Sequence, residues 1–157
     1  MKEQKQLPKK KTYVQKVKLY MVKEETDSKK ASISWPSHVA KLKLISDELI
    51  GSDREKFLCL HLDARNRVIS YEVVAIGSLS QVIVHPREVF KGTILSNAQS
   101  VILCHNHPSG DLTPSKQDID LTKRVRHAGQ ILGIEVLDHM IFGDEKSFFS
   151  MKEKGLL

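Results

Sequence analysis

Cysteine is scarce in this sequence, and long apolar runs are absent. Cys59 and Cys104 are the only cysteines. Each lies in an apolar, strand-like segment outside any Cys-x-x-Cys pair, so we expect both to be reduced core residues. The N-terminal residues MKEQKQLPKKK lack the apolar segment of a signal peptide, and no uninterrupted apolar run approaches membrane-spanning length. These absences predict a cytoplasmic protein with no membrane partner.

Basic residues are concentrated at the N-terminus. The chain of 157 residues has a net charge of +6, with 40% hydrophobic and 28% charged residues, as expected of one globular domain. Residues 1–30 contain ten lysines and four acidic residues, whereas residues 31–157 contain fifteen of each sign. Residues 1–11 are interpreted as a disordered basic arm, followed by a domain over 12–157. The arm could bind nucleic-acid phosphates weakly, or serve only as a solubilising leader.

Hydrophobic periodicity divides the rest of the chain into helices and strands. Strands are expected within 12–23, near a sheet edge, and at 56–63, 68–76, 100–104 and 134–142, with an extended segment at 81–84. Helices are expected from Pro36 to Gly51, from Pro86 onward, and from a cap at Thr113 and Pro114 to about Leu132. This alternation predicts an α/β fold, in which helices cover both faces of a sheet.

Apolar spacings of three and four identify the inward face of each expected helix. The residues predicted to point inward are Val39, Leu42, Ile45 and Leu49 in the first helix, Val89, Phe90 and Ile94 in the second, and Leu121, Val125, Ala128 and Leu132 in the third. Both core strands at 56–63 and 68–76 have apolar residues on both faces, which is typical of strands covered on two sides.

Two histidines and a carboxylate lie close together in CHNHPSGDLTPSKQD, residues 104–118. His105 and His107 are two residues apart, so an extended strand presents both imidazoles to one side. Asp118 precedes Leu121 by three residues and extends the inward stripe of its helix, where a carboxylate is costly unless it meets a cation or good donors. The pattern predicts a metal site formed by His105, His107 and Asp118.

Two histidines and one carboxylate, with no fourth protein ligand evident, are typical of catalytic zinc, which keeps an open position for water. Zinc can lower the pKa of that water from ~15.7 to about 7. Hydrolysis also needs an oxyanion stabiliser, a role that Ser115 fits at the first turn of its helix, and a proton acceptor, which calls for a glutamate from elsewhere. We therefore expect one Zn²⁺ per chain.

The motif His105-x-His107-x7-Ser115-x2-Asp118 resembles the JAMM metalloprotease signature of the MPN (JAB1-like) domain. The surrounding HNHPSGD and PS residues resemble the bacterial RadC family in particular. The similarity continues through VHPREVF at 84–90 and GIEVLDHMIFGD at 133–144 to the closing KEKGLL, and so covers roughly residues 12–157. Longer RadC proteins carry a helix-hairpin-helix DNA-binding region before this domain. About 35 residues precede the first predicted helix here, which are too few for that region.

The resemblance implies a fold and a catalytic base. The family fold is a three-layer α/β/α sandwich with a mixed central sheet, similar to that of cytidine deaminases, and zinc is held by the residues that match His105, His107 and Asp118. The family also has a catalytic glutamate in or just before an early core strand, a place that Glu55 matches in REKFLCL. Glu88, in HPREV, is the rival base, although its expected position in a helix first turn gives it a stabilising role instead.

The remaining polar candidates are interpreted as structural. We expect Lys or Arg partners for Glu72 and Glu135, a helix-entry position for His85, and core or edge positions for His61 and His139. Strand alternation turns Cys104 to the face opposite His105, which excludes it from the ligand set.

The leading functional interpretation is a JAMM-type zinc hydrolase that cleaves a peptide or isopeptide bond in a peptide or protein substrate by metal-activated water. Glu55 would transfer the proton, and Ser115 would stabilise the oxyanion. The alternative is a zinc-binding, DNA-associated repair or mobile-element accessory protein without peptidase activity. The complete ligand set argues against a non-catalytic MPN scaffold, and the absence of His-x-Glu with a later Pro-Cys-x-x-Cys argues against a deaminase.

Overall fold

Helices and strands alternate along the chain in the computed structural model, which describes residues 32–77, 84–144 and 147–157. The helices are α1 (Pro36–Ala40), α2 (Lys43–Glu48), α3 (Pro86–Leu95) and α4 (Lys116–Leu132), and the strands are β1 (Lys56–Leu62), β2 (Val68–Ile76), β3 (Ser100–Asn106), β4 (Glu135–Phe142) and β5 (Phe148–Ser150). The predicted arm at 1–11, the predicted strand at 12–23 and residues 81–83 lie outside these described ranges.

The strands form one mixed sheet in the order β2-β1-β3-β4-β5. β1 is antiparallel to both β2 and β3, β3 is parallel to β4, and β4 is antiparallel to β5. The β1–β2 turn is stabilised by the Asp63 carboxylate, which accepts hydrogen bonds from the backbone N–H groups of Arg65 and Arg67. β1 is buried almost throughout, whereas β2 lies at the sheet edge and is only half-buried. The prediction that both strands are covered on two sides is therefore confirmed for β1 and wrong for β2.

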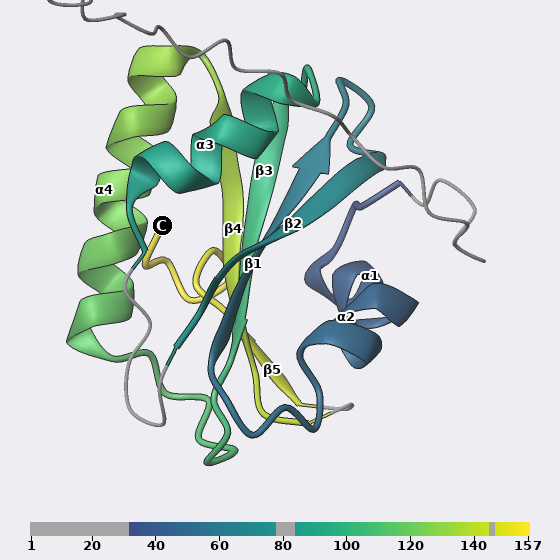
Figure 1. The fold of residues 1–157 in the computed structure, drawn as a ribbon, viewed down its shortest axis with the longest axis vertical. Coiled ribbons are helices and arrows are strands. Elements are labelled where there is room, and N and C mark those ends of the chain that lie inside the picture. The colour runs from purple at the N-terminus through teal and green to yellow at the C-terminus, as the bar shows by residue number, and fades with distance from the viewer. Residues whose placement is uncertain (1–31, 78–83, 145–146) are drawn as a thin grey trace, which may run out of the picture.

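The predicted three-layer arrangement is confirmed. Helices α1 and α2 cover one face of the sheet, and α3 and α4 cover the other (Figure 1). Alternate β1 residues enter different cores: Leu58 and Leu60 pack on the α1–α2 side, while Phe57 and Cys59 pack on the α3–α4 side. Burial of each such side chain stabilises the fold by roughly 1.5–3 kcal/mol. Among the described residues, no helix has the length and apolar character needed to span a bilayer.

The first predicted helix is in fact two short helices. Leu42 has extended backbone angles (φ −69°, ψ 128°), which separate α1 from α2. The four residues predicted to point inward from this segment are nevertheless all buried. α2 ends at Glu48 with Leu49 as its C-cap, so the helix stops before Gly51. Gly51 lies in the turn that follows, and its φ of +72° is the left-handed conformation that glycine adopts most easily.

The inward faces of α3 and α4 differ from prediction at their C-terminal ends. Ile94 is 54% exposed, and Thr93 is buried in its place because its hydroxyl donates to the Val89 carbonyl (2.7 Å). Leu132 is 48% exposed. Gly129 is the buried residue there, and a Cβ on it would lie 2.4 Å from the Ile134 carbonyl oxygen, so the absence of a side chain lets α4 approach the start of β4.

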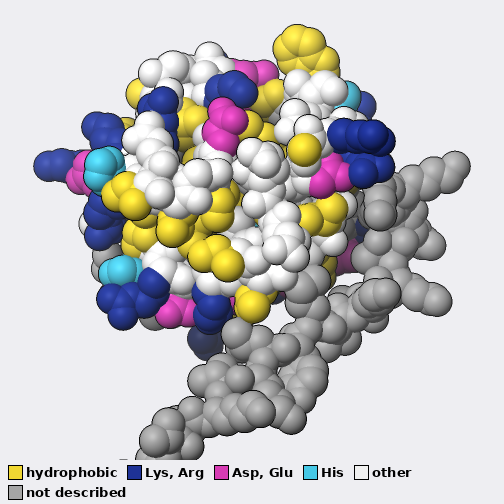
Figure 2. All heavy atoms as spheres, turned by 90° about the horizontal axis from the view of Figure 1, so that it is seen from above, with side chains coloured by type: hydrophobic (Ala, Val, Ile, Leu, Met, Phe, Trp, Pro, Cys, Tyr) yellow, Lys and Arg dark blue, Asp and Glu magenta, His cyan; other side chains and the backbone are white. Residues whose placement is uncertain are grey.

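The ends of α3 and α4 carry exposed hydrophobic side chains, namely Ile94, Leu95, Ile131 and Leu132. Figure 2 shows hydrophobic side chains gathered on this end of the molecule, which is the top of Figure 1. α4 ends next to the start of β4, where Glu135 pairs with Ser100 at the start of β3. This hydrophobic surface therefore lies away from the C-terminal end of β3, which carries His105.

Candidate metal centre

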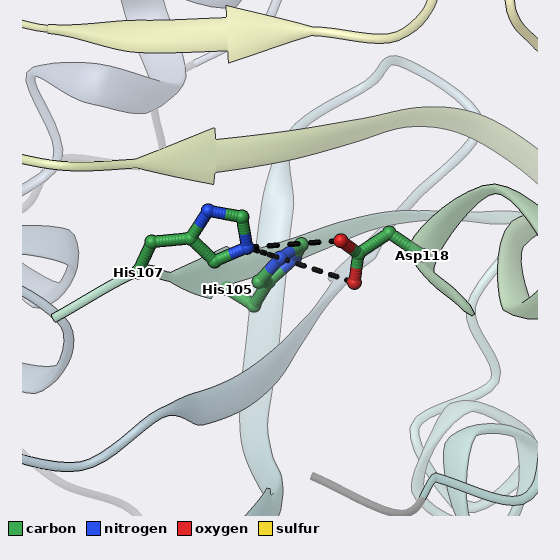
Figure 3. A group of neighbouring side chains, drawn as sticks. All are labelled: His105, His107 and Asp118. Atoms are coloured by element: carbon green, nitrogen blue, oxygen red, sulfur yellow. Dashed lines mark hydrogen bonds and ion pairs between the residues drawn. The ribbon is translucent and has the colours of Figure 1, made fainter. Parts of the chain in front are cut away.

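His105, His107 and Asp118 converge on one point between the end of β3 and the start of α4 (Figure 3). The two Nε2 atoms of His105 and His107 are 2.9 Å apart. Asp118 Oδ1 lies 3.4 Å from His105 Nε2, and Asp118 Oδ2 lies 3.7 Å from His107 Nε2. Within the described ranges, this is the one group of three or more His, Cys, Asp or Glu residues that could hold a metal ion.

The local backbone brings the three residues together. His105 lies within β3, and His107 extends the pairing with β4 because its N–H donates to the Phe142 carbonyl (2.9 Å). The chain then reverses in a turn in which the Gly110 N–H donates to the His107 carbonyl (2.9 Å), and Gly110 adopts a φ of +78°. The turn returns the chain to the start of α4, so residues 105–118 alone bring the three side chains together.

A capping box fixes Asp118 in the first turn of α4. Ser115 is the N-cap: its hydroxyl oxygen accepts from the Asp118 N–H (3.1 Å), and Asp118 Oδ2 accepts from the Ser115 N–H (2.7 Å). The prediction that Thr113 caps this helix was therefore wrong by two residues. The reciprocal Ser-x-x-Asp pair satisfies two backbone donors, which a cap at Thr113 would not do.

The arrangement fits a zinc ion. In a tetrahedral zinc site with metal–ligand distances of ~2.0–2.1 Å, neighbouring ligand atoms lie ~3.3 Å apart. The distances of 2.9, 3.4 and 3.7 Å among the three side chains bracket that separation. Neutral imidazole nitrogens and a carboxylate are ligands that zinc prefers. The ligand set expected from the sequence is therefore geometrically sound.

The pKa values of the three groups favour metal-binding protonation states for Asp118 and His105. Burial raises the pKa of Asp118, but the nearby imidazoles of His107 and His105 and the hydrogen bonds from Ser115 outweigh it and hold the pKa well below its usual range. Burial lowers the pKa of His105 to about 4. The nearby Asp118 carboxylate raises the pKa of His107. A cation would replace the proton that the raised pKa favours on His107, because a metal ligand must be deprotonated.

His107 is oriented by its second ring nitrogen. His107 Nδ1 lies 2.5 Å from the Asp111 backbone carbonyl oxygen, which can only accept a hydrogen bond. Nδ1 therefore keeps its proton, so the neutral, metal-binding form of the His107 ring has its lone pair on Nε2, the atom nearest Asp118. The Asp111 carboxylate accepts from the Thr113 N–H (2.8 Å), which fixes the loop that supplies this carbonyl.

Ser115 lies at the metal centre, but its hydroxyl already has partners. The Ser115 hydroxyl donates to Asp118 Oδ2 (2.6 Å) while its oxygen caps α4. The sequence predicts the helix cap at Thr113 and an oxyanion-stabilising role for Ser115. In the structure the same hydroxyl caps the helix and contacts the Asp118 carboxylate of the candidate metal centre.

Glu55 lies beside the cluster at the start of β1. It is half-buried, and burial together with the negative charge of Asp118 raises its pKa, while His107 acts in the opposite direction. Its backbone is held on both sides by Asn106: the Lys56 N–H donates to Asn106 Oδ1 (2.8 Å), and Asn106 Nδ2 donates to the Arg54 carbonyl (3.0 Å). The residue between the two candidate ligands thus fixes the segment that carries the candidate base.

Glu88 is at a different place. It is exposed in the first turn of α3 and forms an ion pair with Lys91 (2.7 Å). The interaction with Lys91 lowers its pKa, and its other charged neighbours, Arg87 and His85, do not belong to the metal centre. His85 caps α3 by accepting from the Arg87 N–H (3.2 Å), in agreement with its interpretation as a helix-entry residue.

The remaining sequence interpretations are confirmed in part. Both cysteines are free and buried, and Cys104 packs in the core on the α1–α2 side. His61 is a core histidine whose Nδ1 lies 2.8 Å from the Ser70 hydroxyl. The positive charge of Lys91 acts on Glu72, as expected, but burial outweighs it and raises the pKa of Glu72, whose Oε2 is buried without a hydrogen-bond partner. His139 is buried as predicted, but it contacts His105.

Sequence reasoning did not assign Asn106, His139 or Thr122 to the site. For Asn106 a signal existed, because it stands between the two histidines at a strand end where an amide can replace backbone pairing. His139 and Thr122 reach His105 only through the packing of β4 and α4 on β3, and no local pattern reveals that contact.

Comparison with known proteins identifies the family. Residues 33–156 match the family model of the RadC-like JAB domain. This chain belongs to the RadC-like JAB-domain family. It is 54% identical over 114 residues to a UPF0758 protein of Desulforamulus reducens, which is 73% of this chain and 50% of that protein.

Two other RadC-family relatives show the same extent of similarity. Identity is 49% over 134 residues to a UPF0758 protein of Shouchella clausii (85% of this chain, 57% of that protein) and 47% over 140 residues to one of Clostridium perfringens strain 13 (89% and 59%). The chain therefore spans between half and three fifths of the length of these relatives. The names of these relatives state no activity.

Proposed function

We propose that this RadC-family domain is a zinc-dependent hydrolase that cleaves a peptide or isopeptide bond. The observation that carries the proposal is the convergence of His105, His107 and Asp118 beside the half-buried carboxylate of Glu55. Two histidines and one carboxylate leave an open position at a zinc ion, as catalytic zinc sites do. When bound, the ion supplies a Lewis acid that polarises the scissile carbonyl and acidifies a water molecule.

The protein groups supply the proton transfers. Glu55 accepts the proton of the attacking water and delivers it to the nitrogen of the leaving amine, which is general acid–base catalysis by one carboxylate. Its raised pKa, caused by burial and by Asp118, brings the carboxyl closer to the pH at which it can both accept and donate a proton. The hydrogen bonds of Asn106 hold Glu55 in place for both steps.

Ser115 stabilises the tetrahedral oxyanion. Its hydroxyl proton points to Asp118 Oδ2 in the structure, and rotation about the Cβ–Oγ bond turns this proton toward a substrate oxygen. The hydroxyl oxygen keeps its bond from the Asp118 N–H during that rotation, so the cap of α4 is preserved. Removal of an oxyanion donor costs ~10²–10³-fold in turnover.

The experiment compares two carboxylates that the structure separates. Zinc-loaded protein is incubated with a mixture of unfolded peptides and with an isopeptide-linked peptide pair, and mass spectrometry identifies new termini. Glu55→Gln should reduce cleavage ~10²–10⁴-fold, the usual contribution of a general base, with zinc content unchanged. Glu88→Gln, which loses an exposed helix-end charge and its ion pair with Lys91 away from the candidate metal centre, should cleave like wild type.

Absence of cleavage by zinc-loaded wild type would favour the accessory role without peptidase activity. Full cleavage by Glu55→Gln would show that the base lies elsewhere in the protein.

A further inference from the structure

A buried chain of hydrogen bonds connects His105 to the backbone of Asp118. His105 Nδ1 lies 2.8 Å from His139 Nε2, and His139 Nδ1 lies 2.5 Å from the Thr122 hydroxyl oxygen. The Thr122 hydroxyl lies 2.6 Å from the Asp118 carbonyl oxygen, one turn earlier in α4. All of these groups are shielded from solvent, because His105 and His139 are 0% exposed and Thr122 is 1% exposed.

The rings in this chain are held by packing. Phe57 stacks on His105, with ring centroids 6.0 Å apart, and contacts the His139 ring edge-on at 5.4 Å. The backbone of His139 is also fixed, since its N–H donates to the Asp138 carboxylate (2.7 Å) and its carbonyl accepts from the Met151 N–H (3.0 Å). These contacts hold the imidazoles of His105 and His139 against each other.

The position of each proton follows from the last acceptor in this series of hydrogen bonds, the Asp118 carbonyl. The Asp118 carbonyl can only accept a hydrogen bond, so the single hydroxyl proton of Thr122 points to it. Met151 Sδ, 3.4 Å from the same hydroxyl oxygen, is also an acceptor and cannot give that oxygen a proton. The Thr122 oxygen must then accept from His139 Nδ1–H. A neutral His139 has its lone pair on Nε2, which accepts from His105 Nδ1–H.

We infer that Thr122 and His139 are positioning residues that set the tautomer of His105. With its proton on Nδ1, His105 has its lone pair on Nε2, the atom that lies 2.9 Å from His107 Nε2 and 3.4 Å from Asp118 Oδ1. The lone pair thus points into the metal centre before a cation arrives. The inference rests on the zinc site of the proposed function, but not on any peptidase activity.

The opposite arrangement of protons would work against metal binding. If Thr122 donated to His139 Nδ1, then His139 Nε2–H would donate to His105 Nδ1, and the remaining proton of His105 would sit on Nε2. That proton would occupy the position of the cation. It would also remove the hydrogen bond from the Thr122 hydroxyl to the Asp118 carbonyl, so the geometry favours the first arrangement.

The test begins with the metal-free wild-type protein, uniformly labelled with ¹⁵N. Long-range proton–nitrogen correlation spectra distinguish protonated from unprotonated ring nitrogens. We expect His139 to carry its proton on Nδ1 and His105 to carry its proton on Nδ1. A proton on His139 Nε2 would overturn the inference, whatever the protein binds or cleaves.

Zinc affinity of three folded variants then measures the effect. Thr122→Val removes the hydroxyl at nearly constant volume and should weaken zinc binding by about 10- to 100-fold, as loss of partners around a metal ligand does. Thr122→Ser restores the hydroxyl and should restore the affinity. Thr93→Val is the matched control, because Thr93 is also buried in a helix and also donates to the carbonyl four residues earlier (2.7 Å).

Thr93→Val should lose stability as Thr122→Val does, yet bind zinc like wild type. Wild-type affinity in Thr122→Val, or an equal loss in both valine variants, would show that Thr122 has only a structural role. Failure of the wild type to bind zinc would refute the proposed metal site instead, and the tautomer spectra would still decide the inference.

Discussion

Asn106 should control how firmly the start of β1 is held beside the metal centre. Its amide accepts from the Lys56 N–H (2.8 Å) and donates to the Arg54 carbonyl (3.0 Å), so it makes two hydrogen bonds around Glu55. Asn106→Ala removes both. At ~0.5–1.5 kcal/mol for each net hydrogen bond, the variant should lose about 1–3 kcal/mol of local stability.

Amide hydrogen exchange measures this loss directly. The Lys56 amide should exchange roughly 5- to 150-fold faster in Asn106→Ala, which is the same 1–3 kcal/mol expressed as an opening equilibrium. The Leu60 amide lies in the middle of β1 between two paired strands, so it serves as an internal control for global unfolding. Zinc content should be unchanged, because the candidate ligands remain.

Turnover in the proposed hydrolysis should fall more than stability suggests, by ~10²-fold, because a displacement of about 1 Å of a catalytic group has that effect. Unchanged protection of Lys56 in the variant would show that the amide does not hold this segment. Equal acceleration at Lys56 and Leu60 would show that the variant destabilises the whole sheet, and would refute the local role.

Two further predictions concern stability. Gly129→Ala should destabilise the protein by ~1–3 kcal/mol in urea unfolding, because its Cβ would lie 2.4 Å from the Ile134 carbonyl oxygen and α4 would have to shift. The control variant Gln130→Ala, at an exposed position, should be neutral or stabilising. Equal stability of the two variants would contradict the close approach of α4 to β4. Burial lowers the pKa of His61 to about 4. The unfolded chain therefore binds a proton at this residue below about pH 6.5, whereas the folded chain binds it only near pH 4. Stability should therefore be full above pH 6.5 and fall by about 3 kcal/mol toward pH 4 from this group, and His61→Leu should show a correspondingly smaller fall in unfolding titrations, whereas an identical pH profile would refute the assignment.

The convergence of the three candidate ligands could be predicted because its information is local. His105 and His107 are two residues apart on a strand, and Ser115 and Asp118 form a reciprocal cap, so short-range geometry defines the ligand set. The capping residue was misassigned because Thr113 and Pro114 also form a plausible helix start. The competing Ser-x-x-Asp box prevails since both of its side chains satisfy backbone donors.

Other features depend on packing that no local pattern contains. The break at Leu42 leaves every predicted inward residue buried, so hydrophobic spacing alone does not distinguish one helix from two. The exposure of Ile94 and the burial of Thr93 follow from a hydroxyl that finds a carbonyl within its own helix. The contact of His139 with His105 needs the parallel register of β3 and β4, which is a property of the assembled sheet.

The central claim is that His105, His107 and Asp118 hold a zinc ion, and elemental analysis tests it most directly. Wild-type protein and His107→Ala are purified side by side, exposed to the same excess of zinc, and freed of loosely bound metal by gel filtration. Wild type should retain about one zinc ion per chain, as a single site with three protein ligands does. His107→Ala should retain little, because two ligands remain. Equal zinc content in the two proteins, or no zinc in folded wild type, would contradict the account.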